Sequence, residues 1–163
     1  MIKGLHHNAY RCRDSEETRR FYEDFLGLPL ADAFEIQVTK TGRETKVLHS
    51  FYRLGDGSFL AFFEAPDRPF EFKAQHDFDL HIALEVDPAT QQVLFEKGKA
   101  AGIETRGVAD HGFVHSIYFR DPNGYVIELA ARTEGAGTYA LEAEMTAHDH
   151  LARWQASKTD PNS

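Results

Sequence analysis

Hydrophobic positions recur along this chain in two successive sets that follow the same order. Leu80, Ile82, Leu84 and Val86 alternate with small or polar residues, which is typical of a strand with one buried face. The residues 21, 22 and 25 instead recur at helical spacing. These two periods predict helices over 16–25 and 88–101 and strands over 5–13, 32–39, 46–54, 58–65, 80–86, 103–108, 114–120 and 125–131.

Both predicted helices carry start and stop signals. Asp14 stands where an N-cap is expected for the first helix, and Gly27 stands where a left-handed C-terminal cap is expected. Asp87 and Pro88 open the second helix, because proline fits the first helical position, and Gly102 follows its end. Each half of the chain therefore has the order βαβββ.

The repetition predicts an α+β protein made of two similar modules, about 1–66 and 77–132, within one domain over 1–132. The segment 66–77 contains Pro66 and Pro69 and lacks periodicity, so we interpret it as the connection between the modules. The segment 133–163 is a partly helical tail. It begins with a glycine-rich hinge at 134–137, continues as an amphipathic helix over 141–154 and ends in a frayed stretch over 158–163.

Composition narrows the classes of function. A chain of 163 residues with 42% hydrophobic content suits one compact core. Its net charge of -8 argues against nucleic acid and anionic membrane surfaces as partners. Cys12 is the only cysteine, which excludes an intramolecular disulfide. No segment has the apolar length of a signal peptide or membrane span, so we expect a soluble cytoplasmic protein with a small-molecule substrate.

The strand that opens each half presents a histidine, and the last strand of the second half carries a single carboxylate, Glu128, among apolar residues. A lone Glu in a strand can point to solvent, and His81 taken by itself can be an ordinary surface histidine. An ionised carboxylate in an apolar strand is costly unless it is paired or bound to a metal. Because the histidines and Glu128 occupy equivalent ends of repeated units, the pattern favours one divalent metal site.

Four motifs resemble the vicinal oxygen chelate superfamily, which includes glyoxalases, bleomycin-resistance proteins and extradiol dioxygenases. They are Leu-His-His through Asp at 5–14, Arg-Phe-Tyr-Glu-Asp-Phe-Leu-Gly-Leu at 20–28, Leu-His-Ile-Ala-Leu-Glu-Val at 80–86, and Tyr-Phe-Arg-Asp-Pro-Asn-Gly-Tyr-Val-Ile-Glu at 118–128. The resemblance implies that the two modules form an open, barrel-like mixed sheet around the metal. It also implies the ligands His7, His81 and Glu128, with His7 preferred to His6 because the ligand precedes the strand-ending Asp14 by seven residues.

The glyoxalase and epimerase members of that family add a fourth ligand on the last strand of the first module. Aligning Gly57 with Gly124 places Ala61 at this position, and counting back from Pro66 places Phe62 there. Neither side chain binds metals, although a bulge could bring in Glu64. Without Glu64 the site has two histidines and one carboxylate, the arrangement of non-haem Fe(II) oxygenases. We therefore expect Fe(II), with Mn, Zn, Ni or Co as alternatives.

The run from 110 to Glu128 is also similar to the extradiol dioxygenase signature. His111 matches the signature histidine and Tyr118 the tyrosine, while Ala109 departs from the residues that the signature allows. The resemblance implies ring cleavage of a catechol-like aromatic diol, with His111 or His115 and Tyr118 moving protons. The alternative for His111 is an exposed loop histidine.

Two other functions remain open at this stage. One is a lyase, isomerase or epimerase that uses Zn, Ni or Co, with Glu64 as ligand or base. The other is a small-molecule binding protein of the bleomycin-resistance kind, although such binders lack the metal ligands that this chain keeps. The family resemblance further implies a homodimer, with the site inside one chain or shared between two.

Overall fold

A computed structural model describes residues 1–158 except residue 75. The elements follow one another as β1 (Tyr10–Cys12), α1 (Ser15–Arg19), η1 (Arg20–Phe25), β2 (Leu30–Val38), β3 (Glu44–Arg53), β4 (Phe59–Glu64), β5 (His81–Glu85), α2 (Pro88–Ala100), β6 (Thr105–Asp110), β7 (Val114–Arg120), β8 (Val126–Arg132) and α3 (Ala136–Ser157). This order confirms an α+β fold of two βαβββ modules.

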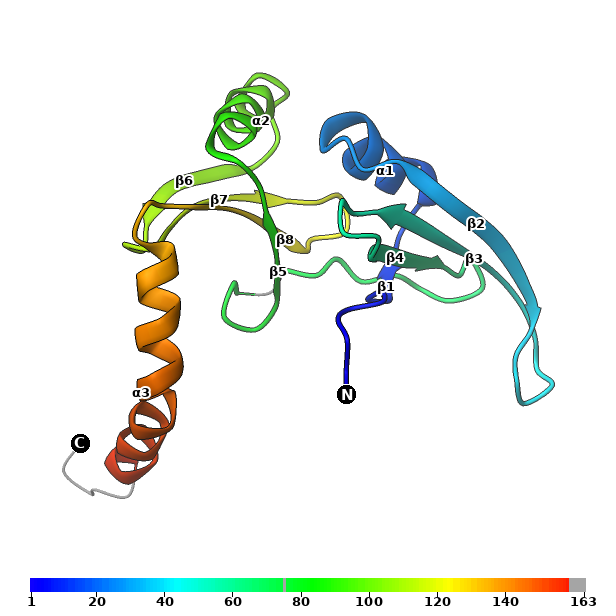
Figure 1. The fold of residues 1–163 in the computed structure, drawn as a ribbon. Helices are drawn as coiled ribbons and strands as arrows, with labels where there is room; N and C mark the ends of the chain where they lie inside the picture. The colour runs from blue at the N-terminus through cyan, green and yellow to red at the C-terminus, as the bar shows by residue number, and fades with distance from the viewer. Residues whose placement is uncertain (75, 159–163) are drawn as a thin grey trace.

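Each module builds its own four-stranded mixed sheet. The strand orders are β1-β4-β3-β2 in the first module and β5-β8-β7-β6 in the second, and the opening strand of each module pairs in parallel with the last. The sheets lie side by side with α1 and α2 on the same side (Figure 1). We call the sheet faces turned away from α1 and α2 the open faces. The sheets do not close into a barrel.

The helix starts follow the capping chemistry of the sequence. The Asp14 carboxylate accepts a hydrogen bond from the Glu17 N–H, and Asp87 accepts one from the Thr90 N–H. The first predicted helix divides into α1 and the π-helical η1, where the Leu26 N–H donates to the carbonyl five residues earlier. The stripe of Phe21, Tyr22 and Phe25 is buried, as its spacing predicted.

The core lies between the helices and the covered sheet faces. It combines the aromatic stripe of η1 with inward side chains of β3, β4, β7 and β8. Tyr22, for example, packs against Tyr52 and Phe62 from the first sheet, and Phe25 packs against Phe119 from the second. The helix of the first module therefore contacts both sheets.

Most strands lie within one or two residues of their predicted bounds, and two depart further for local reasons. The strand predicted over 5–13 shortens to β1, and His7 forms only an isolated bridge to Phe59. Between His7 and β1, the Asn8 side-chain oxygen accepts a hydrogen bond from the Ala61 N–H, which replaces a backbone hydrogen bond of the ladder. The strand predicted over 103–108 shifts to β6, whose pairing with β7 is irregular after Gly107. A Cβ at Gly107 would lie 2.7 Å from the Ser116 carbonyl oxygen, so the strands approach closely there.

The tail forms a longer helix than the sequence pattern predicted. Helix α3 begins at Ala136 instead of 141, so the predicted glycine hinge supplies its cap and first turn. Phe113 stacks on Tyr139 with ring centroids 3.9 Å apart, which anchors this first turn to the second module. The rest of α3 extends away from the sheet on the side opposite α2 (Figure 1). The frayed end predicted over 158–163 lies largely outside the described residues. Among the described helices, none combines the length and apolarity that crossing a membrane requires.

Candidate metal centre

His81 and Glu128 form the central pair of the candidate site. They come from adjacent parallel strands, β5 and β8, and their side chains share the open face of the second sheet. The His81 Nε2 atom lies 3.3 Å from Glu128 Oε2. Glu128 is only 9% exposed, so the solvent-facing alternative for this carboxylate is wrong. A nearly buried carboxylate beside an imidazole nitrogen is a donor pair suited to a divalent cation.

Two further contacts orient this pair. The Asp77 carbonyl oxygen lies 2.7 Å from His81 Nδ1, so Nδ1 donates this hydrogen bond and Nε2 is the ring nitrogen turned toward Glu128. The Ser116 hydroxyl donates a 2.5 Å hydrogen bond to Glu128 Oε1, which leaves Oε2 toward His81. The Asp77 carboxylate in turn accepts two hydrogen bonds from Arg106. This pairing lowers the pKa of Asp77, chiefly through the Arg106 hydrogen bonds.

The spacing of the two donor atoms fits one metal ion. Donors held at about 2.1 Å from an ion and at 90° to 109° to each other lie about 3.0 to 3.4 Å apart. The observed 3.3 Å between His81 Nε2 and Glu128 Oε2 falls in this range. The donor chemistry and geometry of these two residues therefore fit a divalent metal without any rearrangement of the pair.

His7 lies on the open face of the other sheet. Its ring contacts His49 and Phe51 of β3, with centroid distances of 6.1 and 5.4 Å, and its Nδ1 atom lies 2.8 Å from His6 Nδ1. Over residues 1–158 without residue 75, no three His, Cys, Asp or Glu side chains gather closely enough to hold a metal. Within one chain, the structure brings His81 and Glu128 together but leaves His7 apart from them.

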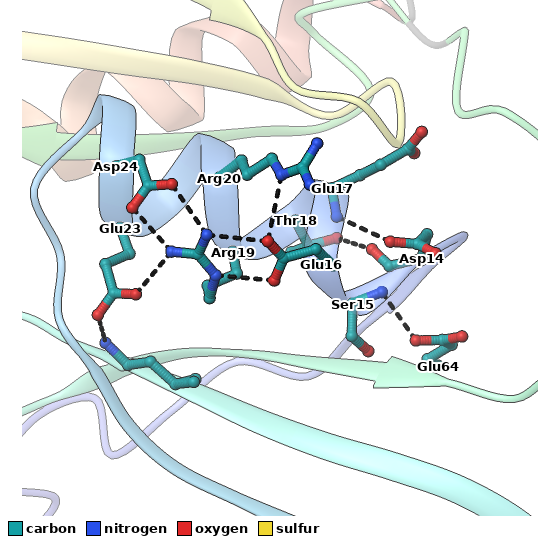
Figure 2. Close-up of polar contacts among 11 residues, drawn as sticks. Asp14, Ser15, Glu16, Glu17, Thr18, Arg19, Arg20, Glu23, Asp24 and Glu64 are labelled. Carbon is teal, nitrogen blue, oxygen red and sulfur yellow. Dashed lines mark hydrogen bonds and ion pairs between the residues drawn. The ribbon is translucent and has the colours of Figure 1, made fainter.

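Glu64 points away from the open face. It follows Leu60 and Phe62 on the covered side of β4, and its carboxylate accepts a 2.7 Å hydrogen bond from the Ser15 N–H at the start of α1 (Figure 2). A carboxylate at a helix start satisfies an unpaired N–H and the helix dipole. Glu64 therefore helps to cap α1 and is not placed to bind a metal on the open face.

The strand registers identify which residues of the two modules correspond. Phe51 pairs with Ala61 in the first sheet, and Tyr118 pairs with Glu128 in the second. Ala61 is thus the counterpart of Glu128, whereas Phe62 lies in the core with no exposure. By the same register His49 corresponds to Ser116. The first module has apolar or aromatic residues where the second has its carboxylate and phenol.

Tyr118 and His111 meet beside the candidate pair of His81 and Glu128. The Tyr118 ring lies directly across the strand pair from Glu128, and its hydroxyl lies 3.2 Å from His111 Nε2. Burial and then the nearby Glu128 charge raise the pKa of Tyr118. His115 has the opposite strand parity, and its ring lies 3.5 Å from Asp110 Oδ1, so it is not placed to act with Tyr118.

Sequence reasoning missed the groups that orient the ligands. Ser116 precedes Tyr118 by two residues, and strand periodicity places both on one face, which is a usable signal. Asp77 acts through its backbone carbonyl, for which side-chain chemistry offers no signal. Arg106 lies over the Tyr118 ring at 5.3 Å from its centroid, a contact that depends on the pairing of β6 with β7.

Comparisons with known proteins agree with the fold. The family model described as the Glyoxalase/Bleomycin resistance protein/Dioxygenase superfamily matches residues 4–129. Comparison with curated protein sequences finds no match. Three solved structures illustrate the structural likeness.

The fosfomycin resistance protein FosX from Mesorhizobium loti is 26% identical, covers 82% of this chain and 96% of its own, and has a TM-score of 0.55. FosX from Listeria monocytogenes, complexed with Mn(II) and sulfate, is 23% identical, covers 85% and 99%, and has a TM-score of 0.60. A glyoxylase/bleomycin resistance protein/dioxygenase domain from Frankia sp. EAN1pec is 18% identical, covers 82% and 100%, and has a TM-score of 0.65.

Proposed function

Because this chain belongs to the glyoxalase, bleomycin resistance protein and dioxygenase superfamily, we propose that it is a metal-dependent enzyme of the extradiol dioxygenase type. Its metal, Fe(II) in this proposal, is held by His81 and Glu128 with His7 as the third ligand. The substrate is a catechol-like aromatic diol, whose two adjacent oxygens suit chelation of one cation. Superfamily membership alone does not choose among the chemistries that this fold hosts.

The observation that carries the proposal is the contact of His111 with Tyr118 next to Glu128. The hydroxyl–imidazole distance is 3.2 Å, and the tyrosine is the cross-strand neighbour of the carboxylate. Both residues match the extradiol signature. His111 lies in the loop before β7 and Tyr118 lies within β7, so the fold of this hairpin brings the two side chains into contact. An imidazole and a phenol in contact form a pair that can hold or pass a proton.

The chain's own residues perform the acid–base part of such a reaction. A bound divalent metal supplies Lewis-acid polarisation of the substrate oxygens and open positions for binding. His111 accepts a proton from a substrate hydroxyl, and the Tyr118 hydroxyl donates a hydrogen bond to oxygen atoms that gain charge. Ser116 and the Asp77 carbonyl keep the two ligands in place while this happens.

We further propose that the active form is a homodimer in which the first module of one chain faces the second module of its partner. His81 and Glu128 would leave positions on a bound metal for further ligands, and within the described residues His7 lies apart from both of them on the open face of the other sheet. The open face also carries large apolar rings such as Phe34, which is 44% exposed. A second copy would cover this surface and supply the missing histidine.

The test combines metal content with oxygen uptake. Protein purified from medium that contains Fe, Mn, Zn, Ni and Co is analysed for bound metal beside the His81→Ala variant. Fe bound by the parent protein and lost in the variant, followed by O₂ uptake with a catechol, supports the proposal. Tyr118→Phe should keep the metal and lower kcat at least about tenfold, since one donor to developing charge is removed. Absence of metal from the parent protein would leave a binding protein of the bleomycin-resistance kind.

A second candidate function follows from the Mesorhizobium loti protein. At 26% identity over 82% of this chain, that fosfomycin resistance protein supports fosfomycin as an alternative substrate of the candidate metal site. Incubation of the Mn-loaded protein with fosfomycin distinguishes the two candidates. Loss of fosfomycin without O₂ uptake would favour this second function, whereas O₂ uptake with catechols and stable fosfomycin would exclude it.

A further inference from the structure

A concave site lies on the open face of the first sheet, near the hairpin between β2 and β3. It is a hollow of about 240 Å³. Three arginines and two threonine hydroxyls line it together with an aromatic ring: Arg11, Arg43, Arg68, Thr39, Thr45 and Phe63. We call it the arginine hollow. Three guanidinium groups around one hollow are unexpected in a chain with a net charge of -8.

The arginines of the hollow lack the carboxylate partners that most other arginines of the described chain have. In the described part of the chain Arg11, Arg43 and Arg68 form no ion pair, whereas each of the following arginines contacts at least one carboxylate: Arg13, Arg19, Arg20, Arg106, Arg120 and Arg132. The Asp67 carboxylate lies beside the lining, at 3.5 Å from the Thr45 hydroxyl. No carboxylate is among the described residues that line the hollow, so the lining itself is positively charged.

Arg11 shows the same deficit in its hydrogen bonds. Its guanidinium is half-buried and donates only to the carbonyl oxygens of Ala65 and Arg68, at 3.4 and 3.5 Å. Its buried Nε–H has no partner within the described residues. Leaving a buried charged donor unpaired is costly, and a guanidinium pairs best with a carboxylate or phosphate. An anion in the hollow would supply such a partner.

The hollow and the candidate metal ligand His7 share one face of the sheet. His7 bridges to Phe59 and Arg11 pairs with Phe63, so these positions are separated by four residues of β4, or about 13 Å. Aromatic rings fill the interval, with His49 stacked on Phe63 at 3.7 Å. Along this face the candidate metal ligand His7 is therefore followed by aromatic rings and then by the guanidinium groups of the hollow.

We propose that the arginine hollow binds an anionic group, a carboxylate or phosphate, at the far end of the substrate whose diol reaches the metal. The substrate class is then an aryl compound with two vicinal oxygens and an acidic side chain of several atoms. This inference rests on the proposed function for the role of the ligand, although the hollow itself belongs wholly to the first module. Arg43 and Arg68 are exposed on loops and act as specificity determinants, without a part in the chemistry.

The test measures binding to metal-free, full-length protein by calorimetry, with 4-phenylbutyrate and its uncharged analogue 4-phenylbutanol. The acid should bind at least about tenfold more tightly than the alcohol, because only the acid can make charge-assisted hydrogen bonds. Arg43→Gln and Arg68→Gln should each weaken the acid several-fold and leave the alcohol unchanged. Arg53→Gln is the matched control, since Arg53 is an exposed arginine of β3 outside the hollow. A parallel titration with phenyl phosphate shows whether phosphate or carboxylate is preferred.

The inference would be overturned if neither 4-phenylbutyrate nor phenyl phosphate bound more tightly than the alcohol, or if binding of the anions survived both substitutions. The outcome is separable from that of the proposed function. If the protein binds the acid through Arg43 and Arg68 but does not take up O₂ with catechols, the anion site is supported and the dioxygenase proposal is wrong. If the protein takes up O₂ with catechols but binds neutral and acidic diols with equal affinity, the dioxygenase proposal is supported and the anion-site proposal is wrong.

Discussion

The Tyr22 hydroxyl donates a 2.9 Å hydrogen bond to Asp121, 99 residues later in the chain, and both side chains are buried. Tyr22 belongs to η1 of the first module, and Asp121 precedes β8 of the second. Asn123 strengthens the same connection, because its side chain accepts the Arg13 N–H at 2.8 Å and donates to Thr18 Oγ1 at 3.3 Å. A buried polar cluster thus joins the two modules.

Removing the Tyr22 hydroxyl should destabilise the whole fold. Tyr22→Phe leaves the buried Asp121 carboxyl without one of its donors, so we expect a loss of about 1 to 3 kcal/mol in the free energy of unfolding. Urea denaturation followed by circular dichroism measures it. Tyr139→Phe is the control, since the Tyr139 ring stacks on Phe113 and is 47% exposed. Equal effects of the two substitutions would contradict this role of the hydroxyl.

The same cluster makes stability depend on pH in an unusual direction. Burial raises the pKa of Asp121, so the folded protein keeps a proton that the unfolded chain loses at a lower pH. As pH rises from the unfolded pKa of about 3.9 toward the folded pKa, this group therefore subtracts stability.

Asp121→Asn carries no such proton and should gain stability relative to the parent protein over this interval. Urea titrations of both proteins at several pH values between about 4 and 7 measure the difference in unfolding free energy. A difference that stays constant, or that moves in favour of the parent protein as pH rises, would show that burial does not control this carboxyl.

Substitution of Glu64 should affect the helix and not the metal. Glu64→Gln weakens the hydrogen bond to the Ser15 N–H and removes a charge at the start of α1, which should cost about 1 kcal/mol of stability. Metal content should stay the same. Glu144→Gln in the exposed part of α3 is a control for the loss of a charge. A fall in bound metal with Glu64→Gln would return Glu64 to the set of ligands.

Mixing two inactive variants tests whether the metal site is shared between chains. In a dimer with shared sites, a His7→Ala chain paired with a Glu128→Gln chain has one intact site and one doubly defective site. Co-expression with two different affinity tags isolates this mixed dimer, which should bind about one metal ion per pair of chains, while each variant alone binds none. Mixed dimers without metal would place all three ligands in a single chain.

Local periodicity was enough to predict the type and approximate position of most helices and strands. The strand at 80–86 and the buried stripe of Phe21, Tyr22 and Phe25 were predicted because alternation and helical spacing depend on nearby residues alone. The failures have a tertiary origin. Asn8 ends the ladder of the opening strand with its side chain, and the stacking of Tyr139 on Phe113 supports a helix start five residues earlier than the pattern indicated.

The candidate site could be predicted only in part for a related reason. The family resemblance, not the repeat, selected His7 over His6, and the structure has His7 beside Phe59 as it has His81 beside Val126. On this register Ala61 is the counterpart of Glu128, as the alignment of Gly57 with Gly124 predicted. Internal symmetry, however, does not determine whether the two equivalent faces meet within a chain. His81 and Glu128 were brought together because their strands are hydrogen-bonded neighbours, whereas His7 belongs to a different sheet.

The separation of His7 from His81 and Glu128 has a thermodynamic consequence. When a partner chain completes the ligand set, metal binding and subunit association become linked equilibria, and each must strengthen the other by the same factor. Metal affinity would then fall on dilution of the protein, and chelation would promote dissociation into monomers. Such an enzyme would be switched on by its own abundance as well as by the supply of metal.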